Sequence, residues 1–157
     1  MRVLLAAFLA LIVLPARCDE VPYAQPAPST SPHPESYAVS LSDAMQLTQL
    51  RHIKLWLAGR SKNWPLANYE LAQLKDTFDK AAVLYLNIPV DYIAAVEKPL
   101  GTLGDAVAAK NLVEFQHGFK DLQAACNACH KAADVGFIVI QTPTSSVFPN
   151  QNFAPER

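Results

Sequence analysis

The apolar side chains between residues 40 and 137 recur every three or four positions, which is the spacing of one face of an α-helix. Turn residues interrupt the pattern at 63–65, at 87–89 and near residue 111, so it divides into four segments. No stretch shows the alternation of apolar and polar residues that a half-buried strand would need. The chain therefore predicts an all-α fold, an antiparallel four-helix bundle with its functional site in the core.

Local signals mark where the first three helices begin or bend. Either Ser40 or Ser42 can cap the first helix, because a hydroxyl can accept a hydrogen bond from a free amide of the first turn. Pro65 suits the first position of the second helix. The third helix contains Pro99, which cannot donate a helical hydrogen bond, so a kink or a break is expected there.

The fourth helix, from about residue 111, has one continuous apolar face. Its members are Leu112, Phe115, Phe119, Leu122, Cys126, His130, Ala133 and Phe137. Cys126, His130 and Ala133 are small or polar among bulky neighbours, so they leave space in the predicted core that a cofactor would fill. Without that cofactor the chain is expected to be loosely packed, because unfilled space destabilises a core.

The same face contains the chain's most specific motif, Cys126-Asn127-Ala128-Cys129-His130. This C-x-x-C-H pattern is typical of covalent attachment of a c-type haem. Two thiols three positions apart on a helix point to one side and can reach the two vinyl groups of a haem. The adjacent imidazole then becomes the proximal ligand of the iron. The motif predicts one covalent haem c, bound through Cys126 and Cys129, with His130 on the iron.

Other uses of two cysteines at this spacing fit the chain less well. Thioredoxin-like redox sites and zinc half-sites share the C-x-x-C pattern. A zinc site would need a second such pair, and a thioredoxin-like site would need strands alternating with helices; the sequence has neither. A chance occurrence of the motif, or a disulfide between Cys126 and Cys129, is the plain alternative.

The N-terminal residues resemble a secretory signal peptide over residues 1–18. A positive start, Met1-Arg2, precedes a short apolar run, and small residues follow it near Cys18. The run is too short to span a bilayer comfortably. A lipid anchor on Cys18 is the alternative, but Arg17 just before it fits a lipidation signal poorly. The expected location is therefore the periplasm or the extracellular space.

Charge limits the classes of partner. Removal of the predicted signal peptide takes away Arg2 and Arg17 and leaves 11 basic residues against 14 acidic ones. This balance gives no basic surface for nucleic acid or for an anionic membrane. The partner expected instead is a redox protein, and the bundle helices could also pair in a homodimer.

The segments that flank the predicted bundle, 40–137, are of a different kind. Residues 19–39 contain five prolines among Ser, Thr and Ala, which is the composition of a linker. His33 lies in this segment and is interpreted as a solvated linker residue. The tail, residues 138–157, has no helical period; an ordered strap and a frayed end are both compatible with it, and the frayed end is preferred.

Two residues of the first helix are candidates for a distal ligand of the iron. Met45, His52 and Trp56 fall within a 40° sector of that helix, on its apolar face. Met45 is expected to lie at the same position along the bundle axis as His130. It is about five residues from the start of the first helix, and His130 is about five residues from the end of the antiparallel fourth helix. His52 is preferred by residue type, since a buried imidazole needs a reason whereas a core methionine is ordinary packing. The alternative role of His52 is a hydrogen bond to a haem propionate or to a backbone carbonyl. His117 points away from His130 around the fourth helix and should be exposed.

These features together resemble the four-helix-bundle c-type cytochromes, the cytochrome c-prime and cytochrome b562 group. The resemblance covers about residues 40 to 137, and its specific part is Cys126, Cys129 and His130 in the last helix. It implies a haem bound between the first and last helices. Members of the c-prime type usually leave the iron five-coordinate, and b562-like members add a methionine from the first helix. The basic residue that c-prime members commonly have a few positions after the haem histidine is absent beyond Lys131.

Three functions follow from this resemblance and the motif. The leading one is electron transfer, with His52 or Met45 as the sixth ligand. The second is binding or sensing of a small gas such as nitric oxide at a five-coordinate iron. The third is a peroxidase-like activity, in which His52 would act as the acid–base group. Enzyme activity is ranked last, because no pair of Arg and His stands out around the expected pocket.

Overall fold

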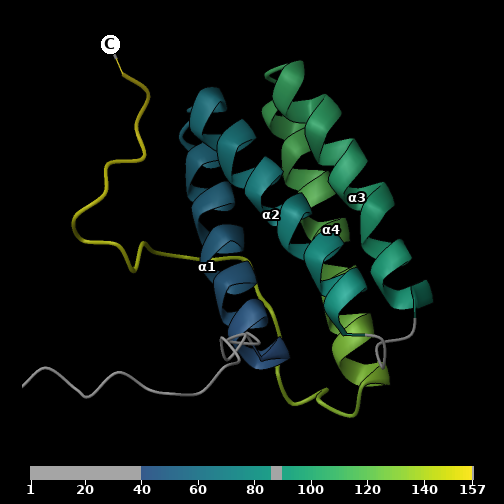
Figure 1. Ribbon diagram of the computed structural model, residues 1–157. Coiled ribbons are helices and arrows are strands. Elements are labelled where there is room, and N and C mark those ends of the chain that lie inside the picture. The colour runs from purple at the N-terminus through teal and green to yellow at the C-terminus, as the bar shows by residue number, and fades with distance from the viewer. Residues whose placement is uncertain (1–39, 86–89, 157) are drawn as a thin grey trace, which may run out of the picture. The chain divides into compact units, whose positions relative to one another are not determined.

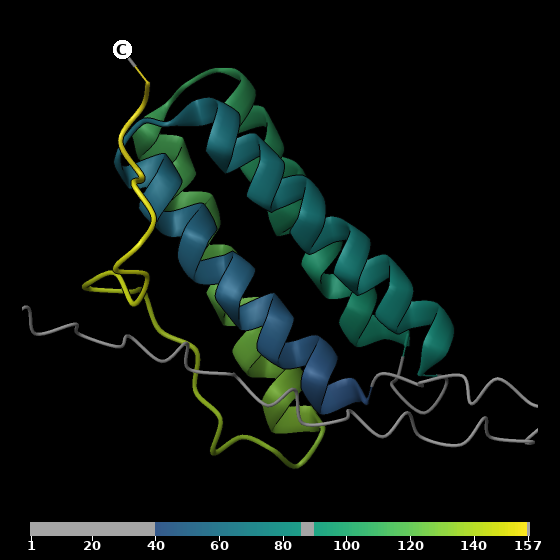
Figure 2. The same cartoon turned by 60° about the vertical axis from the view of Figure 1, so that its left-hand side comes forward.

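The computed structural model describes residues 40–85 and 90–156. It contains four α-helices: α1 (Leu41–Arg60), α2 (Trp64–Leu84), α3 (Val90–Ala108) and α4 (Leu112–Ala132). Consecutive helices run in opposite directions, and no strand occurs within the described ranges (Figures 1 and 2). The predicted all-α bundle is confirmed. The predicted signal peptide (1–18) and linker (19–39) lie outside the described residues.

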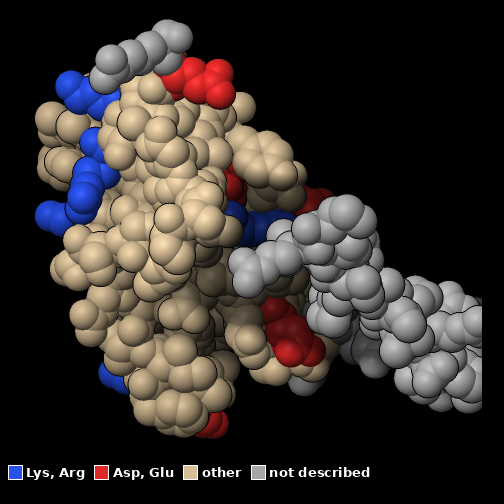
Figure 3. Space-filling model, turned by 90° about the vertical axis from the view of Figure 1, so that its left-hand side faces the viewer, with Lys and Arg blue, Asp and Glu red and all other residues tan. Residues whose placement is uncertain are grey.

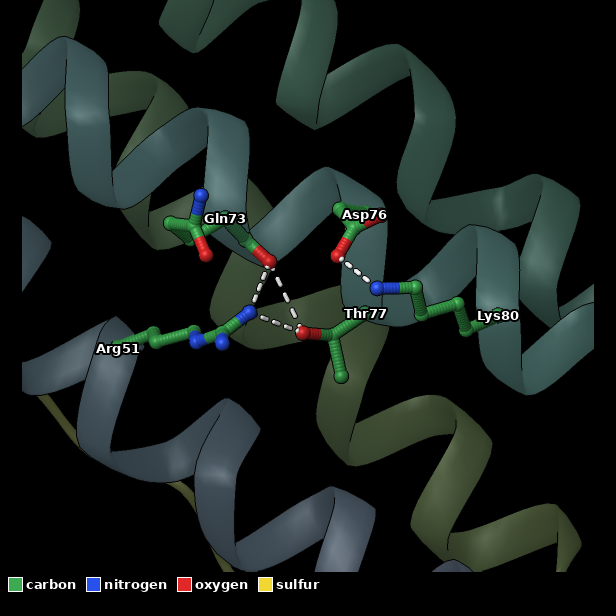
Figure 4. A network of polar contacts seen from close by, with 5 residues as sticks. All are labelled: Arg51, Gln73, Asp76, Thr77 and Lys80. Atoms are coloured by element: carbon green, nitrogen blue, oxygen red, sulfur yellow. Dashed lines mark hydrogen bonds and ion pairs between the residues drawn. The ribbon is translucent and has the colours of Figure 1, made fainter.

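The helices pair unequally. The contacts between α1 and α2, and those between α3 and α4, are far more extensive than the contacts between α1 and α4. Arg51 of α1 contributes to the first pair by donating hydrogen bonds to the Gln73 carbonyl and to the Thr77 hydroxyl of α2 (Figure 4). The Asp76–Lys80 ion pair in the same view is exposed and lies within one helix, so it adds little stability.

The turns α1–α2 and α3–α4 share one local geometry. Three non-glycine residues among those described have a positive φ: Lys62 (60°), Lys110 (54°) and Asp134 (58°). After each of them, the next amide donates to the carbonyl five residues earlier, at 2.9 Å, which is the Schellman ending of a helix. In the two turns that next residue is Asn63 or Asn111, whose side chain also caps the following helix. One asparagine therefore ends one helix and begins the next.

The starts of the four helices agree with the sequence to within a residue, whereas α2 and α4 end a few residues earlier than expected, at Leu84 and Ala132. Ser40 is the cap of α1 and forms a capping box with Asp43. Pro65 occupies the second position of α2 rather than the first, because Asn63 caps the helix at Trp64. The predicted break at Pro99 is wrong: α3 continues through it. Proline removes one hydrogen bond, and the buried side chains Val96, Leu100 and Leu103 on both sides of it pack the helix onto the core.

The core is densest where α1 and α3 end and where α2 and α4 begin. Trp56 of α1 lies 4.9 Å from Phe119 and 6.2 Å from Phe115 of α4, measured between ring centroids. Both phenylalanines are fully buried. A β-carbon added to Gly59 would overlap the ring of Phe115, so this position of α1 needs a residue without a side chain. Aromatic rings therefore fill the small space between α1 and α4 at this end.

The C-terminal residues 137–156, named here the strap, are irregular as predicted but are not frayed. The Schellman ending at Asp134 reverses the chain, and the strap returns along the outside of the bundle beside α4 and α1 (Figure 2). Phe153 is buried, and the amide of Asn63 donates to the carbonyl of Ala154 at 3.0 Å. The sequence alternative of an ordered strap is the one that the structure bears out. Phe137, predicted on the apolar face of the fourth helix, lies beyond the helix end and is 82% exposed.

Candidate functional site

The C-x-x-C-H motif occupies the last two turns of α4. Cys126, Cys129 and His130 have the spacings i, i+3 and i+4, so all three project from the same side of the helix. Cys126 packs against the hydrophobic core, and both cysteines are free thiols that are partly buried. The structure therefore brings together the three residues that the motif predicts.

The electrostatics of the two thiols differ from those of a reactive dithiol. Burial, with a smaller contribution from the neighbouring Cys129, raises the pKa of Cys126 to about 11. Burial also raises the pKa of Cys129. Redox and zinc-binding cysteines work as thiolates, which a lowered pKa favours. These thiols remain protonated at neutral pH, and a thioether bond to a porphyrin vinyl group would leave no charge in this apolar surrounding.

The imidazole of His130 is oriented by the strap. Its Nδ1 lies 2.8 Å from the carbonyl oxygen of Ile138. A carbonyl can only accept, so Nδ1 must donate the proton, and Nε2 of the neutral ring retains its lone pair. Histidines that bind metals are commonly held in this way, with one nitrogen donating to a carbonyl and the other free for the metal. The donor set of the motif thus fits a haem iron through Nε2.

The side chains at the motif end of the bundle are also compatible with an apolar group. The buried residues of α1 and α2 at this end are small: Ala44, Thr48, Thr77 and Ala81. Large apolar side chains are exposed nearby at the end of α2 and the start of the strap: Val83, Leu84, Phe137 and Ile138. Small buried side chains leave room, and exposed apolar ones gain stability when a hydrophobic group covers them.

His52 lies away from the motif. It is 4% exposed, and its ring stacks on Phe119 with 4.3 Å between centroids. Phe119 precedes His130 by 11 residues in α4, about 16 Å along the axis at about 1.5 Å per residue. Burial lowers the pKa of His52 to about 4, and its Nε2 has no hydrogen-bond partner in the described part of the chain. His52 and His130 are therefore not brought together.

Met45 lies at the height of the motif. It precedes His52 by seven residues, which is two turns along the same face of α1. Because α1 and α4 are antiparallel, the position opposite Met45 lies about seven residues beyond Phe119, at Cys126. The Met45 side chain is partly buried. Of the two candidates for a distal ligand, Met45 is the one at the height of the cysteines.

His52 instead faces a groove between α1 and the strap. The groove has a volume of about 340 Å³ and is lined by Gln49, His52, Ile53 and strap residues 139–145 and 147. None of these residues is charged. Figure 3 looks onto this side of the molecule, which is mostly free of charged groups, with Lys and Arg side chains gathered along one edge.

The sequence did not predict three residues of the site. Two of them, Asn127 and Gln123, donate hydrogen bonds to the strap. The third, Ile138, belongs to the strap, and its carbonyl pairs with His130. The side-chain amide of Asn127, inside the motif, was a signal for a hydrogen bond to backbone. Nothing in the irregular sequence of the strap indicated its path. His117 is exposed, as predicted, and His33 lies outside the described residues. Within the described ranges no three His, Cys, Asp or Glu side chains are grouped to hold a metal ion, and no helix has the length and apolar character to cross a membrane.

Comparisons with models of known protein families, with curated protein sequences and with solved structures gave no significant match. The interpretation of the site therefore follows from its own residues, their spacing and their contacts.

Proposed function

We propose that this protein is an exported c-type cytochrome that transfers electrons through one covalently bound haem. Cys126 and Cys129 would hold the haem through thioether bonds, and His130 would be the proximal ligand of the iron. When bound, the haem supplies a reversible one-electron couple. The chain contributes attachment, an apolar surrounding and a fixed imidazole.

The observation that supports the proposal most is the hydrogen bond between Nδ1 of His130 and the carbonyl of Ile138. It selects the tautomer whose Nε2 can bind a metal. An ordinary surface histidine at a helix end would have no need of such a bond. The protonated thiols and the small buried residues of the motif end agree with it.

Met45 is our candidate for the distal ligand, in place of His52. Met45 is level with Cys126 along the bundle, whereas His52 is level with Phe119. A thioether opposite an imidazole stabilises the reduced iron and favours a high reduction potential. The b562-like proteins, which the sequence resembles, also take a methionine from the first helix.

Binding of a small gas at a five-coordinate iron is the second candidate function. Ala44 and Thr48 are small buried residues of α1 on either side of Met45, and they leave room for a diatomic ligand if Met45 does not bind. The two functions differ in the state of the sixth coordination position, which spectra report directly.

The attachment is tested by maturing the full chain with a cytochrome c maturation system and extracting it with acid–acetone. We expect haem to stay with the protein and to give a pyridine haemochrome spectrum with two saturated vinyl groups. The double variant Cys126→Ala, Cys129→Ala is the control and should release all its haem. Haem that extracts freely from the unsubstituted chain would reject the proposal.

The sixth ligand is tested by Met45→Ala, with His52→Ala as the matched control on the same face of α1. We expect a six-coordinate low-spin spectrum for the unsubstituted protein and for His52→Ala, and a high-spin spectrum for Met45→Ala. A change of spin state in His52→Ala alone would reverse the assignment. No change in either variant, with a high-spin unsubstituted protein that responds to nitric oxide, would favour gas binding.

A further inference from the structure

Three polar side chains of α4 hold the strap in a regular way. They pair in order with alternate residues of the strap: Gln123 with Thr142, Asn127 with Ile140, and His130 with Ile138. We call this set the polar ladder. The spacing on α4 is four and then three residues, which keeps all three side chains on one side of the helix. The spacing on the strap is two residues, and its direction is opposite to that of α4.

The two spacings match in length. Three or four residues of a helix advance by about 4.5 to 6 Å, and two residues of an extended chain advance by about 6.6 Å. The strap can therefore meet one ladder side chain of α4 after another. The carbonyls of Ile138 and Ile140 both turn toward α4, since each lies within hydrogen-bond distance of one of its side chains.

Asn127 is the centre of the ladder. Its Nδ2 donates to the carbonyl of Ile140 at 3.0 Å, and its Oδ1 accepts from the amide of Ile140 at 2.8 Å. Only a side-chain amide offers a donor and an acceptor at one end, as a neighbouring backbone would. Gln123 supports the same residue more weakly, with Nε2 at 3.5 Å from the Ile140 carbonyl, and accepts from the Thr142 hydroxyl at 2.6 Å.

We propose that Asn127, a residue between the two cysteines of the motif, positions His130 through the strap. Its two hydrogen bonds to Ile140 fix the register of the strap on α4. Two residues earlier, that register brings the carbonyl of Ile138 onto Nδ1 of His130. A shift of the strap along α4 would move the Ile138 carbonyl and leave Nδ1 without this partner. The effect on an iron ligand rests on the proposed function, whereas the effect on the imidazole does not.

Asn127→Ala tests the register first. The Ile140 amide donates to Asn127 Oδ1, so its hydrogen exchange reports this contact directly. We expect exchange at Ile140 to be about tenfold faster in Asn127→Ala, which corresponds to loss of one hydrogen bond of about 1.4 kcal/mol. Gln116→Ala is the matched control, since Gln116 is an amide side chain of the same helix two turns before Gln123. It should leave exchange at Ile140 unchanged.

The imidazole of His130 is then followed in the same variants. In a chain without haem, its two ¹⁵N signals distinguish the tautomers, and we expect the Nδ1–H form in the unsubstituted chain and a mixture in Asn127→Ala. In the haem-loaded protein, loss of the bond to Ile138 makes His130 a weaker electron donor, so the reduction potential should rise. Asn127→Asp retains the acceptor for the Ile140 amide, and it should change both measurements less than Asn127→Ala does.

Faster exchange at Ile140 together with a changed His130 signal in Asn127→Ala, and neither change in Gln116→Ala, supports the proposal. An unchanged His130 signal in Asn127→Ala overturns it, whether or not the exchange changes. Unchanged exchange at Ile140 also overturns it. If no covalent haem is found, the proposed function fails, but the nitrogen signals of the haem-free chain still decide the role of Asn127. Loss of helical circular dichroism identifies any variant that has failed to fold, and Asn127→Asp then replaces it.

Discussion

The two ends of the bundle are built from different side chains. The packed half, where α1 and α3 end and α2 and α4 begin, is filled by large residues: Leu55, Trp56, Leu71, Leu103, Phe115 and Phe119. The motif half, where α1 and α3 begin and α2 and α4 end, buries mainly small ones, Ala44, Thr48, Thr77 and Ala81, with Val96 as a larger one. The helices are continuous through both halves, so the difference lies in the side chains.

This difference indicates where the energy of folding comes from. Each large side chain buried in the packed half contributes about 1.5–3 kcal/mol relative to exposure. The motif half has fewer such residues and keeps bulky apolar side chains on its surface, among them Val83 and Phe137. We therefore expect the packed half to hold the bundle together and the motif half to depend on a further apolar component. A haem on Cys126 and Cys129 would be that component.

Removal of the haem is the most severe test of the difference between the two halves. We expect hydrogen exchange of core amides in the motif half, such as Thr48 and Gln123, to become about a hundredfold faster in the haem-free chain, because partial opening there exposes little apolar surface. Amides of the packed half, such as Leu103 and Phe119, should change much less. Equal acceleration in both halves, or equal thermal stability with and without haem, would show that the halves are not independent.

A second change tests the packed half alone. In Gly59→Ala the new methyl group would overlap the ring of the fully buried Phe115, and we expect a loss of about 3 kcal/mol of unfolding free energy. Gly101→Ala in α3 is the control, because nothing lies within 4 Å of its added carbon. There the higher helix propensity of alanine should stabilise the protein by up to about 1 kcal/mol. Urea unfolding at constant slope measures both, and a neutral Gly59→Ala would mean that the packed half adapts easily.

Much of this architecture follows from periodicity in the sequence. The buried positions of α4 from Phe115 to Leu122 were predicted from spacing alone, because burial of one helical face dominates the choice of residues there. The Schellman turns were not predicted, since Lys62 and Lys110 occupy a conformation that usually belongs to glycine. The helix through Pro99 was missed because core packing overrides local propensity there.

At the site, too, the sequence predicted some features and not others. The motif itself identified Cys126, Cys129 and His130, which are neighbours in sequence and therefore in space. The relation of His52 to His130 depends on the relative height of α1 and α4, which sequence spacing within each helix does not determine. The path of the strap depends on side-chain hydrogen bonds from Gln123 and Asn127 to backbone atoms, which leave no periodic signal. Residue type alone ranked His52 above Met45, whereas the positions of the two residues along α1 favour Met45 in our proposal.

A third change tests the boundary between the halves. Burial lowers the pKa of His52 to about 4 from an ordinary value of 6.5, so the unfolded chain binds a proton between these values and the folded chain does not. Stability therefore falls as the pH decreases from about 6.5 toward 4, by about 2 kcal/mol at pH 5. His52→Gln should remove this part of the pH dependence, whereas His117→Gln, at an exposed position, should retain it.

Unfolding free energies measured from pH 5 to pH 7 provide the comparison. The same pH dependence in His52→Gln as in the unsubstituted protein would mean that His52 remains accessible to protons, through the groove beside the strap. His52 would then belong to the motif half rather than to the packed half.

The smallest expected effect compares the same substitution in both halves. Lys110 and Asp134 have φ values of 54° and 58°, a region that costs a side-chain-bearing residue about 1–2 kcal/mol and glycine almost nothing. After the higher entropy of an unfolded glycine is subtracted, Lys110→Gly should stabilise the packed half by about 1 kcal/mol. Lys120→Gly, at an exposed position inside α4, should instead destabilise by about 1 kcal/mol.

The gain in stability from Asp134→Gly should equal that from Lys110→Gly only in the haem-loaded protein, because a motif half that is already open gains nothing from a better helix ending. Equal gains for Lys110→Gly and Asp134→Gly in the haem-free chain would contradict the division of the bundle into two halves.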